Sequence, residues 1–230
     1  MQSLSPRAGS PRAEVADAAR VLAGLGLVTA YGHVSSRMDD HIVITPAADL
    51  ADVHEADLVK VPEDASVLPP GAPAESWLHL CLYRARPDVT AIARAQPPAA
   101  YAAAATTREL RPYHGQASWL GRTVPVYDDA RPLRSAELAG AAARVLTDGE
   151  ALLLRGNGAV TVGASPGLAV ARMWLLSVAC EVWLSTGQYA YSRRLTDTEI
   201  ASWRAVQSEL LPRLWRHLRR RAAVVPMEGL

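Results

Sequence analysis

The chain has 230 residues, half of them hydrophobic, and a formal net charge of +1, which predicts one domain with a substantial core. A charge this close to zero gives no general case for a nucleic-acid or membrane partner; we expect no apolar run of the roughly 20 residues that span a bilayer and no signal-peptide core. Cys81 and Cys180 lie in apolar helical runs, as expected for buried thiols in a cytoplasmic protein.

The N-terminal quarter predicts a lead-in, a helix and three short strands. Residues 1–12 are rich in Ser, Pro and Gly, so we expect a disordered lead-in before a single domain over residues 13–230. Helical spacing of apolar residues and alternation on either side of a turn at Asp39-Asp40 predict the first elements. These are a helix over 13–24 and strands over 34–37, 41–44 and 58–61.

The next stretch predicts a helix, a turn, a strand and a second, Ala-rich helix. The expected bounds are 75–83 for the first helix, 89–93 for the strand and 99–107 for the second helix. Glu75 stands at the start of the first helix, and Arg94 and Gln96 stand where the strand ends. Because residues two apart at a strand end point to the same side, Arg94 and Gln96 are expected to line one pocket.

The C-terminal half adds further strands and helices. The expected strands cover 121–127, 151–154 and 159–162, and the expected helices cover 133–145 and 166–186. The helix over 166–186 is apolar nearly all round, which indicates the core or a subunit contact. A capping box at Thr196–Glu199 starts the last helix, in which one face carries Trp203, Val206, Leu210 and Leu214. The alternation predicts an α/β fold with α/β/α layers.

Several motifs match those of a known family in unbroken order. They are Gly32-His33-x-Ser35-x-Arg37, Thr45-Pro46, Pro73-Ala74-Glu75, His79, Tyr83 and Pro87-Asp88-Val89, the last followed by the hydrophobic strand. In these segments, and over about residues 13–200 in all, the chain resembles the class II aldolase and adducin N-terminal family. The resemblance implies a three-layer fold with a mostly antiparallel central sheet, and a homotetramer whose active site lies at a subunit interface. It also implies a mobile C-terminal tyrosine, for which the pattern does not choose between Tyr189 and Tyr191.

Three residues depart from this family where it holds a divalent metal. Its His-x-His at the strand end is replaced by Arg94 and Gln96, and the histidine of its Leu-Leu-x-x-His-Gly segment is replaced by Asn157. Arg94 cannot be a ligand, because a guanidinium has only donors and stays protonated. Neutral amide oxygens are poor zinc ligands. We therefore expect no metal at this site, and no other cofactor.

The remaining chemistry predicts a metal-independent lyase acting on a small carboxylated substrate, a keto or hydroxy acid. Arg94 would replace the positive charge of the metal, and Glu75 keeps the position of the family's general acid/base. His33 is the third catalytic candidate. Decarboxylation, retro-aldol cleavage, dehydration or cyclisation would each fit, in a specialised biosynthetic pathway. The residues expected to bind the substrate are Gln96, Asn157, Gly32, Ser35, Thr45, His79 and His114. An orienting hydrogen bond stays open as the role of His33, and a structural role stays open for His79.

The loop after Thr45-Pro46 limits the class of substrate that is expected. In the family this loop often carries a hydroxyl and a glycine that hold a phosphate or carboxylate end, whereas Ala47 and Ala48 stand there in this chain. We therefore expect an unphosphorylated substrate.

Three alternatives stay open from the sequence. Glu75 and Arg94 could form an ion pair that only fills the vacated pocket. His33, His79 and His114 could build a new metal site, although their spacing is not that of ligands. The fold could also serve assembly without catalysis, as a scaffold of the adducin kind.

Overall fold

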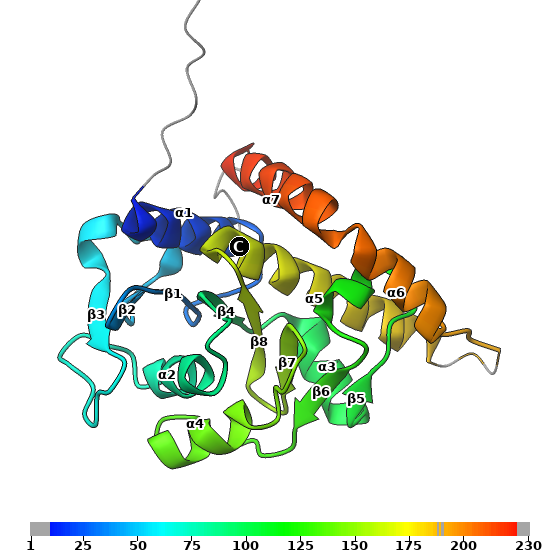
Figure 1. The fold of residues 1–230 in the computed structure, drawn as a ribbon, viewed down its shortest axis with the longest axis horizontal. Helices are drawn as coiled ribbons and strands as arrows, with labels where there is room; N and C mark the ends of the chain where they lie inside the picture. Colours follow the sequence, from blue (N-terminus) through cyan, green and yellow to red (C-terminus); the bar gives the residue numbers. More distant parts are fainter. Residues whose placement is uncertain (1–9, 188, 190, 225–230) are drawn as a thin grey trace, which may run out of the picture.

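A single eight-stranded sheet with helices on both faces forms the protein (Figure 1). The computed structural model describes residues 10–187, 189 and 191–224. The strand order is β3-β2-β1-β4-β8-β7-β6-β5, and every neighbouring pair is antiparallel except β6 and β7. The structure thus confirms the three-layer α/β/α fold with a mostly antiparallel central sheet.

The strands are short, and most of them connect to a helix or to a tight turn. They are β1 (His33–Arg37), β2 (His41–Ile44), β3 (Val59–Pro62), β4 (Ala91–Ala95), β5 (Glu109–Leu110), β6 (Val124–Tyr127), β7 (Ala151–Leu154) and β8 (Gly158–Gly163). The helices are α1 (Pro11–Gly24), α2 (Ser76–Ala85), α3 (Pro98–Thr106), α4 (Ala136–Ala143), α5 (Pro166–Thr186), α6 (Asp197–Ala205) and α7 (Gln207–Val224). Short 3-10 segments cover Leu50–Asp52, Glu55–Asp57 and Gly115–Leu120.

The sheet separates two hydrophobic cores. Helices α1, α3, α5 and α7 pack on one face, and α2 and α4 cover the other (Figure 1). Strand β4 lies in the middle and is buried along its whole length. Its alanines at 91, 93 and 95 pack into the α5 side, whereas Ile92 packs into the α2 and α4 side. By strand alternation, Arg94 shares the face of Ile92, so a charged side chain enters a mostly apolar layer.

The first helix begins two residues earlier than expected. The Ser10 hydroxyl accepts from Ala13 N, and Pro11 occupies the first helical turn, where its missing N–H is not needed. Arg12 also belongs to the fold, because its guanidinium donates to Leu58 O at 2.8 Å. The expected lead-in therefore does not include Ser10, Pro11 and Arg12, and its remaining part, residues 1–9, lies outside the described residues.

The last helix is interrupted, which the sequence pattern did not predict. The capping box at Thr196 is present, but α6 ends at Ala205 and α7 begins at Gln207. The indole of Trp119 donates to Trp203 O at 2.8 Å. This bond engages the carbonyl that a continuous helix would pair with Gln207 N, so the docking of Trp119 favours a break at this point.

Helix α5 passes the length and composition test of a membrane span, contrary to the expectation from sequence. It has 21 residues, and its most apolar stretch of 18 residues has a mean hydropathy of 1.5. However, 61% of this stretch is buried inside the protein. We interpret it as the central core helix.

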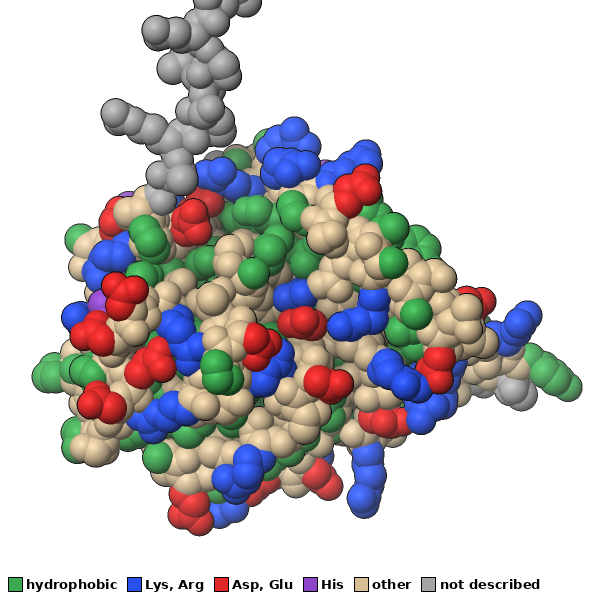
Figure 2. All heavy atoms as spheres, viewed as in Figure 1, with side chains coloured by type: hydrophobic (Ala, Val, Ile, Leu, Met, Phe, Trp, Pro, Cys, Tyr) green, Lys and Arg blue, Asp and Glu red, His purple; other side chains and the backbone are tan. Residues whose placement is uncertain are grey.

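On the face drawn in Figure 2, acidic and basic side chains are interspersed. Both cysteines are free thiols; Cys180 is buried as expected, whereas Cys81 is only half-buried.

Candidate active site

The central strands place Arg94 beside His33. Arg94 of β4 pairs in register with His33 of β1, and cross-strand partners project their side chains to the same face. That face is covered by α2, whose N-terminal cap residue is Glu75. Three residues far apart in sequence therefore converge where β1, β4 and the start of α2 meet.

The β7–β8 turn brings Asn157 to the same place. Gly158, which follows it, has a φ of +83°, a conformation that L side chains rarely adopt. A Cβ at Gly158 would lie 2.3 Å from Ala95 O and 2.9 Å from Gln96 Cα. Only glycine permits this close approach, and the approach sets Asn157 against the end of β4.

Neutral amides surround the Arg94 guanidinium. Arg94 Nη2 donates to the Asn157 side-chain oxygen through a short hydrogen bond. With its amide turned so that both of its ends are paired, Gln96 accepts from Arg94 Nη1 at 2.8 Å and donates to Tyr31 O. Arg94 thus contacts both Gln96 and Asn157, the other two residues at the positions where the resemblance implies metal ligands.

No carboxylate pairs with Arg94. Among the described residues, no carboxylate oxygen lies within 4.0 Å of its guanidinium nitrogens, and only 3% of Arg94 is exposed. Burial lowers the pKa of Arg94 and the charge of Glu75 raises it, but a guanidinium stays protonated. The ion pair that would merely fill the pocket is therefore not formed, and Arg94 remains a buried cation.

Glu75 and His33 form the second half of the site. Glu75 Oε2 lies 3.9 Å from His33 Nε2, and the Glu75 side chain is 24% exposed whereas that of His33 is 7% exposed. Burial, and secondarily the charge of Arg94, lower the pKa of His33 to about 3. His33 is consequently neutral at physiological pH and able to accept or donate a hydrogen bond.

These residues line one pocket of about 500 Å³. Of the residues expected from sequence, it contains Gly32, His33, Glu75, Arg94, Gln96 and Asn157. A Cβ at Gly32 would lie 2.4 Å from Val28 Cγ1 and 3.2 Å from Arg94 O, so glycine is needed to seat this loop. The pocket also contains residues that the sequence did not single out, namely Ala30, Tyr31, Ala74, Tyr101, Pro132 and Arg134, and the methyl groups of Ala47 and Ala48 form part of its wall.

Four residues expected to bind substrate lie outside this pocket. Thr45 Oγ1 accepts from Val34 N at 3.2 Å and holds the loop to β1. Ser35 and His79 are fully buried behind the pocket and hydrogen-bond to each other at 2.7 Å. His114 lies next to the 3-10 segment that packs against α6, where burial lowers its pKa. The internal contacts of Ser35, Thr45 and His79 account for their position.

The donor set does not fit a divalent metal. The Arg94 guanidinium has no lone pair to offer, and the oxygens of Gln96 and Asn157 already accept from it. Within the described part of the chain, no group of three or more His, Cys, Asp or Glu side chains is arranged to hold a metal ion. His33 and His79 have ring centroids 6.2 Å apart, but His114 is not near them, so the three do not form a new site.

Comparison with known proteins identifies the family of this chain. The model of the family described as Class II Aldolase and Adducin N-terminal domain matches residues 13–184. The chain belongs to this family. It is 29% identical to a 3,4-dihydroxyphthalate decarboxylase of Rhodococcus jostii (strain RHA1), over 93% of this chain and 96% of the relative. It is 32% identical to the Arthrobacter keyseri protein of the same name, over 69% and 71%.

Solved structures of family members share the fold. An L-fuculose-1-phosphate aldolase of Thermus thermophilus is 28% identical, with a TM-score of 0.70 over 80% of this chain and 97% of the other. An aldolase II superfamily protein of Pseudomonas syringae, 22% identical, has a TM-score of 0.76 over 96% and 94%. The second likeness concerns the fold alone.

The depressed pKa of His33 predicts a stability that depends on pH. Between about pH 6.5 and about pH 3 the unfolded chain binds a proton at His33 that the folded protein does not, so stability falls as the pH is lowered through this window. His33→Gln removes this contribution. Measured by urea unfolding, the wild type should lose about 2 kcal/mol more than the variant between pH 7 and pH 5. Equal losses would contradict a buried, neutral His33.

Proposed function

We propose that this chain is a metal-independent decarboxylase of small aromatic carboxylates, with 3,4-dihydroxyphthalate as the first substrate to test. Family membership and the decarboxylases among its relatives support an enzyme of the lyase class. The observation that carries the finer proposal is the buried Arg94 guanidinium, which among the described residues has amide partners but no carboxylate partner. A carboxylate substrate would supply the negatively charged partner that Arg94 does not have among the described residues.

The energetics of burial support an anionic ligand at Arg94. Removing an ion from water costs several kcal/mol, and neutral hydrogen bonds offset only part of that cost. A planar guanidinium offers a fork of donors that matches a carboxylate or a developing oxyanion. The unpaired cation therefore makes the empty pocket less stable than a pocket that holds an anion.

Arg94 is proposed to hold the group that stays on the substrate rather than the carboxylate that leaves. Decarboxylation converts a charged carboxylate to neutral CO2, so a cation on that carboxylate would stabilise the ground state and slow the reaction. A cation on a retained carboxylate binds the ground state and the transition state alike and so holds the substrate without slowing the reaction, and a cation on a ring oxygen that gains negative charge stabilises the transition state. Arg134 adds a second positive charge to the pocket wall, which suits a substrate with two anionic groups.

Glu75 is the proposed proton carrier. For a hydroxylated aromatic carboxylate, a proton adds to the ring carbon that bears the leaving carboxylate. The carbon–carbon bond then breaks, CO2 departs, and the bonding electron pair restores the aromatic ring. The reaction consumes one proton in all. Glu75 lines the pocket and remains partly exposed, so it can deliver this proton and regain one from solvent.

The walls of the pocket agree with a flat, unphosphorylated substrate. Ala47 and Ala48 present methyl groups where many family members have polar groups, and Tyr31 and Tyr101 add aromatic surface. Dehydration and cyclisation need the same proton carrier but have no counterpart among the relatives named above. Retro-aldol cleavage has one in the L-fuculose-1-phosphate aldolase, but the substrate in that name is phosphorylated. A scaffold without catalysis would gain nothing from an unpaired buried cation.

The homotetramer with its active site at a subunit interface stays a proposal, as does the cytoplasmic location. Tyr31 is 71% exposed and Tyr101 is 39% exposed, and both line the pocket. Large apolar side chains at an open pocket are surface that a second subunit could cover.

Replacing Glu75 tests the proton carrier. Glu75→Gln keeps the size of the side chain but cannot exchange a proton, so kcat for 3,4-dihydroxyphthalate should fall at least about 100-fold. Binding of the substrate, measured by calorimetry, should persist, because Arg94 is untouched. A variant with wild-type turnover would remove Glu75 from the mechanism.

Replacing Arg94 tests the anion site. Loss of one partner of a buried charge pair costs about 2 to 5 kcal/mol, so Arg94→Ala should raise Kd and KM for the substrate at least about 30-fold. Arg122, exposed and paired with Asp197 on the surface, provides the matched control: Arg122→Ala should leave both constants unchanged. If Arg94→Ala binds the substrate as the wild type does, the carboxylate is held elsewhere.

A further inference from the structure

A polar seam runs from the pocket through the α2 side of the core. Alternate residues of β1 share one face of the sheet, and residues four apart share one face of α2. The two sets face each other in three pairs, His33 with Glu75, Ser35 with His79, and Arg37 with Tyr83. We call these six residues the seam.

The middle of the seam is a buried chain of hydrogen bonds. Ser35 Oγ lies 2.7 Å from His79 Nδ1 and 2.8 Å from the Tyr83 hydroxyl. All three residues have no exposed surface, and apolar side chains such as Leu78 and Leu82 belong to the same core. Hydrophobic residues of similar size would fill this space without the desolvation cost of polar groups, so packing alone does not account for the seam.

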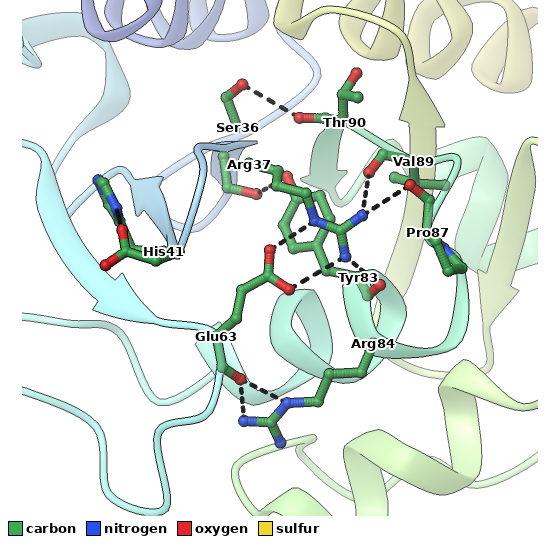
Figure 3. A network of polar contacts seen from close by, with 11 residues as sticks. Ser36, Arg37, His41, Glu63, Tyr83, Arg84, Pro87, Val89 and Thr90 are labelled. Carbon is green, nitrogen blue, oxygen red and sulfur yellow. Dashed lines mark hydrogen bonds and ion pairs between the residues drawn. The ribbon is translucent and has the colours of Figure 1, made fainter.

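The far end of the seam is clamped by charge (Figure 3). The Arg37 guanidinium lies over the Tyr83 ring, 4.9 Å from its centroid, and donates to Glu63 at 2.6 Å and to the Tyr83 carbonyl. Further bonds run from Arg37 to the carbonyls of Pro87 and Val89. These contacts hold the Tyr83 ring and its hydroxyl in one orientation.

The hydrogen bonds can point in only one direction without leaving a buried hydroxyl idle. If Ser35 donated to Tyr83, the Tyr83 O–H would have no acceptor among the described residues. Tyr83 therefore donates to Ser35, and Ser35 donates to His79 Nδ1. Burial raises the pKa of Tyr83 and lowers that of His79, which keeps the donor protonated and the acceptor neutral. The remaining proton of His79 then lies on Nε2, which has no hydrogen-bond partner among the described residues. The opposite direction would leave two groups unpaired, the Tyr83 O–H and the lone pair of Nε2.

His79 in turn meets the catalytic candidates. Its ring lies edge-on to the ring of His33, with centroids 6.2 Å apart and an angle of 78° between the planes. His33 is confined between this ring and Glu75, whose Oε2 is 3.9 Å from His33 Nε2. The orientation of His79 thus limits the orientation that His33 can adopt beside Glu75.

We propose that Ser35, His79 and Tyr83 are positioning residues, which hold the His33 imidazole in place beside Glu75 and do not touch the substrate. In this account Arg37 fixes the Tyr83 ring, the Tyr83 hydroxyl fixes Ser35, and Ser35 fixes the His79 ring that packs against His33. The kinetic part of this inference rests on the proposed function, whereas the geometric part can be measured without any substrate.

The first experiment is nitrogen-15 NMR of the histidine side chains in the full-length protein. Long-range proton–nitrogen correlations should show His79 of the wild type with its proton on Nε2. Ser35→Ala removes the donor to Nδ1, so the His79 tautomers should mix and the ring signals of His33 should shift. Thr161→Val is the matched control, because it also removes a fully buried hydroxyl, which donates to Ala169 O on the opposite face of the sheet.

Two NMR results would overturn the proposal. One is a wild-type His79 with its proton on Nδ1. The other is a set of His33 signals in Ser35→Ala that matches the wild type and Thr161→Val. Because these spectra require no turnover, they stand whether or not the chain decarboxylates any substrate.

The second experiment is steady-state kinetics with a substrate that the wild type decarboxylates. Ser35→Ala and Tyr83→Phe should lower kcat roughly tenfold or more, since small displacements of a reacting group are costly. KM should stay within about twofold of the wild type, because the Arg94 site is intact. Thr161→Val should lose comparable thermal stability and keep its kcat. Equal kcat in all four proteins would reduce the seam to a structural role.

Discussion

The site depends on one electrostatic constraint, a buried arginine that carries a full charge and has no carboxylate partner in the described part of the chain. Arg94 reaches this position because β4 is the central strand and both of its faces are covered. The amides of Gln96 and Asn157 orient the guanidinium without neutralising it. At the place where the resemblance to the family implies a metal, this chain has the Arg94 guanidinium, which combines a positive charge with a directional set of donors.

Much of the fold could be predicted from local signals. A long, almost continuous apolar run located α5, strand alternation and the Asp39-Asp40 turn located the β1–β2 pair, and the capping box at Thr196 located the start of α6. The break after α6 could not be predicted, because it depends on Trp119, which approaches from a distant 3-10 segment. The apolar composition of α5 likewise does not distinguish a core helix from a membrane span; its burial in the folded structure does.

The residues of the site could be predicted only where their spacing in a strand, or a family motif, fixes where their side chains lie. The two-residue spacing of Arg94 and Gln96 placed both in one pocket, and the resemblance to the family added Asn157 and Glu75. Arg134 and Tyr101 come from other segments that reach the pocket through tertiary packing alone. Ser35 and His79 were expected to bind substrate, yet Ser35 Oγ and His79 Nδ1 hydrogen-bond to each other in the core. The two-residue spacing in β1 and the four-residue spacing in α2 show which residues of each element share a face. They do not show that these two faces pack against each other, which is what forms the seam.

The measurement that tests the account most directly is the turnover of 3,4-dihydroxyphthalate by protein stripped of metal with a chelator, combined with elemental analysis of the same sample. If Arg94 supplies the positive charge of the site, the stripped protein keeps the full rate, contains no stoichiometric divalent ion, and gains nothing from added zinc or manganese. Activity that disappears on stripping and returns with one divalent ion per chain would contradict the account, because the donors around Arg94 could not hold that ion.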